Sequence, residues 1–191
     1  MPKPSLREAF LDAGRAEFHV NGYHGTGVAA IAQRAGGPKG SFYNHFASKE
    51  ELAVAVIAGY ADSRRMEMLD ESRITPLARI RAHFEYLKAD LARHDYKRGC
   101  MFGNFAAEVA STNDTLKLVI DEALDYWGEH LAGALEDARA RGDIAASVDP
   151  LSTARLLVDA WEGAAMRAKA VGDSSPIDNF ISVVFDRILV P

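Results

Sequence analysis

The sequence predicts an all-α fold, and three observations support this prediction. Apolar residues recur at the 3.6-residue period of an amphipathic helix, from Leu6 to Ala13 and again from Ile177 to Leu189. No segment shows a convincing alternation of apolar and polar residues, which is the pattern of a half-buried strand. The 7 prolines lie near the ends of the chain or where a helix can begin, so none of them interrupts a helix.

The helices can be placed in order from these periods and from their capping residues. Three begin with an oxygen-bearing side chain followed by proline, at Thr75-Pro76, Asp149-Pro150 and Ser175-Pro176. Ser48 and Glu51 form the pattern of a capping box, and Gly142 and Gly172 stand where the left-handed residue after a helix belongs. About nine helices are expected, over residues 5–21, 27–34, 38–45, 49–69, 76–93, 101–110, 114–141, 150–171 and 176–189.

Composition indicates a globular chain with a substantial core, since 48% of the 191 residues are hydrophobic. The N-terminus has no signal-peptide or transit character, and no run approaches the ~18 apolar residues that span a bilayer. A single cysteine, Cys100, excludes a disulfide within the chain and suits a reducing compartment. We therefore expect a cytoplasmic protein without a membrane partner or a cofactor.

The segment from Phe18 to Lys49 opposes the overall charge of the chain. It contains no Asp or Glu, although the whole chain carries 27 acidic residues against 22 basic ones. Its pattern indicates two short helices, 27–34 and 38–45, joined by a glycine turn. Phe42 and Phe46, four residues apart, can be buried while their polar neighbours face outward. The segment is therefore typical of a helix-turn-helix that reads DNA through one focused patch.

Eight residues of this segment are candidates for contacting DNA. Because the first turn of the second helix enters the major groove, Lys39, Ser41 and Asn44 are expected nearest the base edges. Phosphate contacts are expected from Thr26, Tyr43, His45 and Lys49, with Gly40 completing the set. The alternative is an ordinary helical hairpin whose polar face is solvated.

The pattern Gly-x-x-Lys-Gly-Ser-Phe-Tyr-x-His-Phe-x-Ser-Lys-Glu-x-Leu, from Gly36 to Leu52, resembles the signature of the TetR family of bacterial transcriptional regulators. The resemblance implies a DNA-binding domain over residues 1–48 and an effector-binding and dimerisation domain over 49–191, with helix 49–69 connecting them. It also implies a homodimer on double-stranded operator DNA. We expect a repressor that is released by a small-molecule effector or by modification of Cys100. Gly37 and Ala30 depart from the family pattern, and we expect two successive glycines to loosen the turn.

The last two helices are the expected dimerisation surface. The resemblance implies that helices 150–171 and 176–189 pair with their twins in a four-helix bundle. The last helix carries a long apolar stripe, and the helix before it offers small residues that allow close approach. The alternative is that both helices bury these faces within their own subunit.

The effector candidates lie in the middle and late parts of the chain. Cys100 follows Lys97 and Arg98, which could lower the pKa of its thiol, whereas a cysteine in a helix is often a small buried hydrophobe. The Gly-Cys-x-x-Gly-Asn stretch resembles a TetR subgroup that responds to electrophiles and small unsaturated acids. A reversible ligand in an apolar pocket is the more general expectation. The candidates are Tyr86, Cys100, Phe102, Asn104, Phe105, Trp127, Trp161 and Arg167.

Two rival functions can be weighed against a regulator. A small helical enzyme would use Cys100 as nucleophile and His83, His94 or His130 as base, but no catalytic or phosphate-binding motif supports it. The spacing of these histidines also matches no compact metal site. A helical partner-binding module would keep the hairpin without the phosphate contacts. The sequence therefore favours a regulator with no catalytic residues and no metal.

Overall fold

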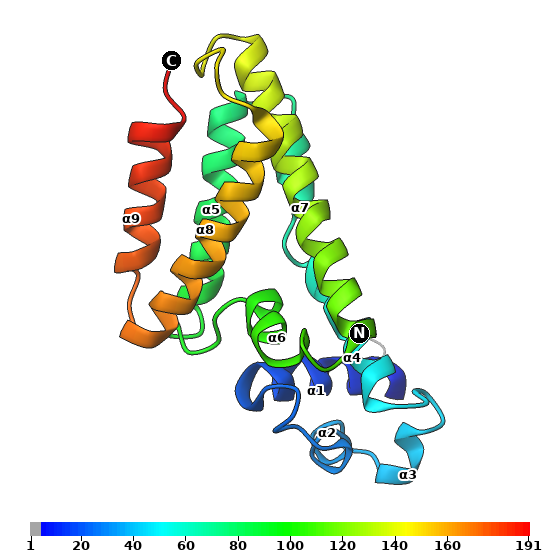
Figure 1. Cartoon of the computed structure of the whole chain (residues 1–191). Coiled ribbons are helices and arrows are strands. Elements are labelled where there is room, and N and C mark those ends of the chain that lie inside the picture. Colours follow the sequence, from blue (N-terminus) through cyan, green and yellow to red (C-terminus); the bar gives the residue numbers. More distant parts are fainter. Residues whose placement is uncertain (1–4) are drawn as a thin grey trace. The chain divides into compact units, whose positions relative to one another are not determined.

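The computed structural model describes residues 5–191 and confirms the all-α prediction. The described residues form nine α-helices, labelled in Figure 1, and two short helical turns of other type. The α-helices are α1 (Leu6–Asn21), α2 (Val28–Arg34), α3 (Lys39–Phe42), α4 (Lys49–Asp62), α5 (Pro76–Ala92), α6 (Met101–Val109), α7 (Asp114–Ala140), α8 (Pro150–Val171) and α9 (Ser175–Val183). The additional turns are the 3₁₀ helix η1 (Met66–Asp70) and the π-helical turn η2 (Val184–Ile188).

The helix expected over 49–69 is interrupted, and this part of the prediction is wrong. Helix α4 ends at Asp62, and Arg65 takes the left-handed conformation with φ 58° before η1 begins. A non-glycine residue in that conformation turns the chain sharply and ends the regular hydrogen bonding. The polar residues 62–65 therefore break the helix, and α4 does not continue to residue 69.

The capping residues behave partly as expected. The Ser48 side chain accepts from the Glu51 N–H at 3.0 Å, but the Glu51 carboxylate accepts from Ala47 N at 2.6 Å, one residue before the position of a capping box. Asp149 caps α8 by accepting from Ser152 N at 2.7 Å. Gly142 and Gly172 have φ of 76° and 82°, as expected for residues that follow a helix.

The chain packs as two compact units. One unit contains residues 5–63 together with 101–121, and the other contains 64–100 together with 122–191. Helices α4 and α6 therefore belong to the same unit as the three N-terminal helices. Helix α7 continues without a break from one unit into the other.

The core of the first unit is built around α1. Phe10 and Phe18, on one side of α1, are 0% and 2% exposed, because the apolar residues of this helix recur at helical spacing. Phe10 meets Phe42 edge-on at 5.5 Å, which holds the second helix of the hairpin. Phe18 meets Phe105 of α6 at 5.5 Å, so the same helix anchors both α3 and α6.

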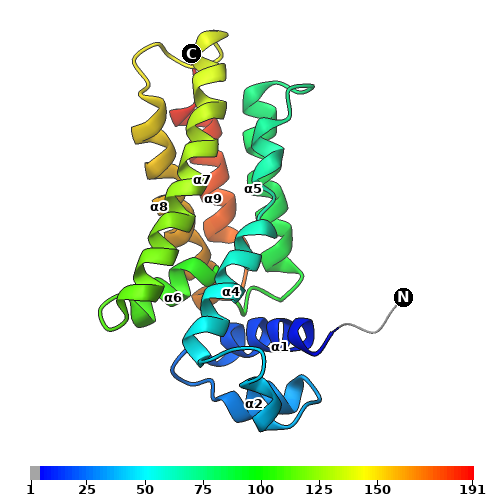
Figure 2. The same cartoon turned by 90° about the vertical axis from the view of Figure 1, so that its right-hand side faces the viewer.

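The core of the second unit is an aromatic cluster between α5, α7, α8 and α9, which run side by side in Figures 1 and 2. Phe84 stacks on Trp161 at 5.5 Å and meets Phe180 at 4.9 Å. Trp127 joins from α7 at 6.5 Å from Trp161. The cluster brings one large ring from each of four helices together and so fixes their packing.

Candidate functional site

The turn between α2 and α3 is a Schellman motif. Gly36 has φ 71°, its N–H donates to Gln33 O at 3.1 Å, and the Gly37 N–H donates to Ala32 O at 3.1 Å. These are the two hydrogen bonds that define this helix ending, and the left-handed residue they require is best supplied by glycine. Two defined hydrogen bonds therefore hold the turn.

Gly37, which departs from the family pattern, has a steric explanation. A Cβ at this position would lie 3.1 Å from Ser41 Oγ, 3.2 Å from Leu6 Cδ1 and 3.5 Å from Phe10 Cζ. The space that an apolar side chain at position 37 would occupy is thus filled from α1. In this chain, Leu6 packs against the turn where relatives with an apolar residue at position 37 would place that side chain.

Helix α3 buries one face and presents the other. Phe42 and Phe46 are 0% and 1% exposed and lie 5.7 Å apart, with the Arg7 guanidinium 5.1 Å over the Phe46 ring. On the opposite side Lys39, Gly40 and Asn44 are exposed, and Tyr43 is 54% exposed. The exposed set thus contains a cation, an amide and a phenol, which are donors suited to base edges and phosphates.

Ser41 and His45 are less available than their neighbours. The Ser41 hydroxyl donates to Pro38 O at 2.7 Å, within its own turn. His45 is half-buried, with its ring 5.8 Å from that of Phe10. Each keeps a partly accessible side chain, but each also supports α3.

In the structure, the Thr26 and Lys49 side chains bind backbone groups of the loop between α1 and α2. Thr26 is 1% exposed and its hydroxyl donates to Gly22 O at 2.6 Å, and the N-terminal cap of α2 is Gly27. Lys49 Nζ donates to Tyr23 O at 2.8 Å and to Thr26 O at 3.0 Å. The ammonium group also lies 4.1 Å from the centre of the Tyr23 ring. Both side chains therefore hold the loop between α1 and α2.

Glu108 of α6 holds the same loop from the other side, and sequence reasoning missed it. Its carboxylate accepts from Tyr23 N at 2.8 Å and from His24 N at 2.6 Å. Gly22, with φ 71°, leaves room for it, since a Cβ there would lie 2.5 Å from Glu108 Oε2. Burial lowers the pKa of Lys49, and the charge of Glu108 partly offsets this. A carboxylate and an ammonium thus bind the N–H and C=O groups of one loop.

The effector candidates fall into separate packing clusters. In the first unit, Phe102 meets Tyr60 at 5.0 Å, and Phe105 packs on Phe18 and Tyr23. In the second unit, Trp127 and Trp161 belong to the aromatic cluster.

The remaining effector candidates are dispersed in the same way. Tyr86 lies beneath the Arg65 guanidinium at 5.8 Å, Asn104 is half-buried, and Arg167 is exposed on α8. Cys100 is 6% exposed, which favours the alternative of a small buried hydrophobe over a reactive thiolate.

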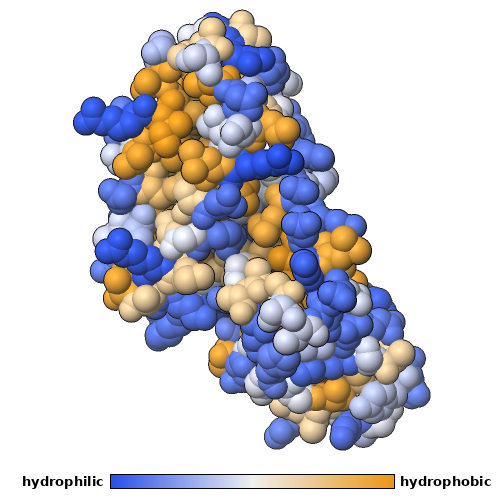
Figure 3. Space-filling view, in the orientation of Figure 1, coloured by the Kyte–Doolittle hydropathy of each residue, from blue (hydrophilic) through white to orange (hydrophobic). Residues whose placement is uncertain are grey.

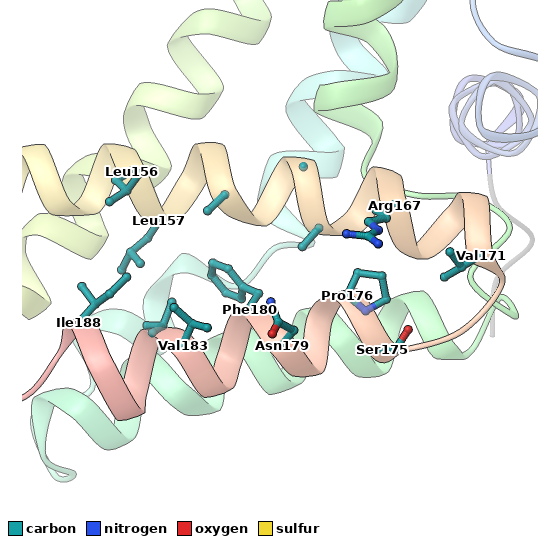
Figure 4. A pocket seen from close by; sticks show the side chains of 14 residues that line it. Leu156, Leu157, Arg167, Val171, Ser175, Pro176, Asn179, Phe180, Val183 and Ile188 are labelled. Atoms are coloured by element: carbon teal, nitrogen blue, oxygen red, sulfur yellow. The ribbon is translucent and has the colours of Figure 1, made fainter.

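A groove of about 710 Å³ lies between α8 and α9. Figure 3 shows apolar side chains gathered over these two helices, and Figure 4 shows the groove with Arg167 beside Pro176 at one end and Leu157 beside Ile188 at the other. The small residues Ala160, Gly163 and Ala164 line the α8 side. The helix pair therefore offers an elongated, mostly apolar surface.

The expected stripe of the last helix is largely used within the chain. Five of its seven members, Ile177, Phe180, Ile181, Val184 and Leu189, are buried in the second unit, and the other two, Phe185 and Ile188, are half-buried. The large apolar residues left exposed on this helix pair are different ones, namely Leu151, Leu156, Met166, Val171 and Val183. Phe180, Val184 and Ile188 of the stripe also line the groove, so the surface open to a partner includes part of the stripe.

Two other findings concern the described residues alone. Between residues 5 and 191 no group of three His, Cys, Asp or Glu side chains is arranged to hold a metal ion. In the same range no helix is long and apolar enough to cross a membrane.

Two family models match the chain. Residues 10–56 match the model described as "Bacterial regulatory proteins, tetR family", and residues 76–184 match "Tetracyclin repressor-like, C-terminal domain". The "Transcriptional regulator AcuR" of Cereibacter sphaeroides is 32% identical over 184 residues, which cover 94% of this chain and 84% of that protein. The "HTH-type transcriptional repressor DhaR" of a Mycobacterium species is 29% identical over 192 residues, covering 99% and 95%. A crystal structure of regulatory protein TetR from Rhodobacter sphaeroides superposes with a TM-score of 0.89 at 31% identity, covering 97% of this chain and 100% of that one.

Proposed function

Because the chain belongs to the TetR family of transcriptional regulators, we propose that it is a repressor that contacts its operator through Lys39, Tyr43 and Asn44. The chain is a DNA-binding regulator and not an enzyme. The observation that carries the assignment of residues is the exposed polar face of α3 within a segment free of acidic side chains. We infer that the protein acts in the cytoplasm, because its proposed target is operator DNA.

The groups on this face divide into two kinds of contact. Lys39, at the start of α3, and Asn44, in the turn that follows α3, are exposed and are the groups suited to base edges. Tyr43 is 54% exposed, and its ring meets that of Phe42 edge-on at 5.3 Å. A phenol held in this way suits a phosphate oxygen. The side chains of Thr26, Lys49 and Glu108 are proposed to affect DNA binding indirectly, because they hold the loop that precedes α2.

The test is a comparison of two double variants. Lys39→Ala with Tyr43→Ala should weaken binding to the operator by about 10- to 100-fold. A matched control is Lys117→Ala with Tyr126→Ala, since Lys117 is exposed and Tyr126, at 51%, is as exposed as Tyr43. Fluorescence anisotropy with an operator fragment selected from the source genome gives both affinities and their salt dependence. Equal affinities for the two double variants would refute the assignment.

We further propose that the regulator dimerises through α8 and α9, with a second copy covering the groove. Leu156 and Val183 are 54% and 42% exposed on facing helices, and small residues on α8 allow a close approach of another helix. Exposed apolar side chains gathered on one face mark an interaction surface. The resemblance to the family, whose members form dimers on twofold operators, supports the same occupant.

Release of the repressor by a small molecule is the regulatory part of the proposal, and a reversible ligand is favoured over modification of Cys100. A thiol that is 6% exposed is poorly accessible to an electrophile. N-ethylmaleimide should therefore leave operator binding unchanged in the wild type, as in Cys100→Ser. Release of the wild type alone would instead establish the cysteine as the sensor.

A further inference from the structure

Two buried polar rings meet edge-on in the second unit, between α5 and α7. His83 and Trp127 are 0% and 1% exposed, and their ring centroids lie 5.8 Å apart with planes at 64°. Among residues 5–191, three buried nitrogens of this pair have no hydrogen-bond partner. They are Nδ1 and Nε2 of His83 and the indole Nε1 of Trp127. Buried polar atoms are nearly always paired, because an unpaired one loses its hydration without replacement. Two such groups in contact point to a partner from outside the chain.

The surroundings of this pair define the kind of partner. Phe84 lies beside both rings, 5.8 Å from His83 and 6.3 Å from Trp127, and stacks on Trp161. The side chains next to the pair are therefore aromatic rings. One helical turn before His83, Arg79 is 5% exposed, and its Nε has no partner within residues 5–191. A ligand with an acceptor oxygen could pair with the unpartnered N–H groups, and a short apolar part of it could pack against the aromatic rings.

The charges around the pair argue for a neutral ligand. Burial lowers the pKa of His83 to about 4, with the Arg64 charge and His130 acting in the same direction and Glu67 opposing them. The backbone of Arg65 approaches the ring and raises the pKa slightly, without meeting hydrogen-bond geometry. At neutral pH the imidazole is therefore uncharged and offers one donor and one acceptor.

The cations near the pair are already compensated. Arg64 pairs with Asp90 at 2.8 Å, and Arg79 pairs with Asp137. An anion buried here would lose its hydration without gaining an unpaired cation.

We propose that His83 and Trp127 form a binding site for a small neutral molecule with an acceptor oxygen, such as an aliphatic amide or ketone. Trp127 Nε1–H donates to the ligand oxygen, and the His83 ring forms a second hydrogen bond to the same polar group. The apolar part of the ligand packs against Phe84. As a description of the effector site the inference rests on the proposed function, but binding is measured without DNA.

The test uses the two tryptophans of the chain. Their indole N–H groups give two signals in a nitrogen–proton correlation spectrum, which Trp161→Phe assigns. The full-length protein is titrated with butan-2-one, propionamide and propionate, which have nearly the same shape but differ in charge and hydrogen bonding. Both neutral compounds should shift the Trp127 signal saturably. His83→Leu should weaken this binding at least tenfold, whereas His24→Leu, at an exposed histidine, should not.

Three results would overturn the proposal. They are a Trp127 signal that no neutral compound shifts saturably, saturation by propionate alone, and unchanged binding in His83→Leu. The first result would mean that the pair holds only solvent. The proposed function fails separately, if the wild-type protein shows no sequence-selective binding to DNA.

Discussion

Glu108 provides the sharpest prediction about how α6 is attached to the DNA-binding helices. Glu108→Ala removes an acceptor from two backbone N–H groups, those of Tyr23 at 2.8 Å and His24 at 2.6 Å. A hydrogen bond to a charged group contributes about 1.5–3 kcal/mol. The His24 N–H is exposed and can turn to water, so the contribution from that bond is smaller. Together the two bonds should stabilise the loop by about 2–3 kcal/mol.

Amide hydrogen exchange measures this effect locally. Loss of about 2 kcal/mol should speed exchange of the Tyr23 and His24 amides by about 30-fold, because each 1.4 kcal/mol is a factor of ten. Glu108→Gln keeps one acceptor oxygen and should have a smaller effect. Glu129→Ala, at an exposed carboxylate of α7, is the control. If exchange of the two amides in Glu108→Ala matches the control, the carboxylate does not hold the loop.

Gly22 allows the same contact to be tested by a double-mutant cycle. In Gly22→Ala the new Cβ meets Glu108 Oε2 at 2.5 Å and also strains a backbone with φ 71°. Removing Glu108 relieves the collision but not the strain, so the two substitutions should be non-additive by about 1 kcal/mol or more. Additive effects on the free energy of unfolding would contradict the geometry.

Three further predictions concern the turn, the core and the dimer. Gly37→Val should destabilise the DNA-binding unit by about 1–3 kcal/mol in urea unfolding, because the space is filled by Leu6; a stabilised variant would show that the turn is underpacked. The pKa of His83 is lowered from 6.5 to about 4 in the folded protein. As the pH falls, the unfolded chain therefore binds a proton at His83 before the folded protein does. Stability should therefore be full above pH 6.5 and fall by about 3 kcal/mol as the pH drops to 4. His83→Leu should remove that fall, and an unchanged pH profile would disprove the origin given for it. Ala164→Glu, in the groove, should yield monomers in sedimentation velocity, whereas dimers of normal affinity would place the interface elsewhere.

Much of the fold could be predicted because its signals are local. Helix α8 begins and ends where the sequence predicts, since Asp149, Pro150 and Gly172 act on the residues next to them. The break after Asp62 was missed, because no glycine or proline marks it and Arg65 takes a conformation that its side chain does not favour. The backbone conformation of such a residue is decided by the packing of the unit around it.

The candidate site divides in the same way. Lys39, Tyr43 and Asn44 could be found from the sequence, because Phe42 and Phe46 fix which side of α3 is buried. The roles of Thr26 and Lys49 could not, since their partners are backbone groups brought near by folding. A helical period likewise marks an apolar face without stating what covers it.

The sequence by itself determined an all-α regulator with a helix-turn-helix, because helical period, capping and the glycine turn act over a few residues. The tertiary structure decided the contacts between residues distant in the chain. It joined Glu108 to the loop at Tyr23, buried the stripe of the last helix and brought His83 against Trp127. Such contacts depend on the packing of whole helices, and no local pattern in the chain encodes that packing.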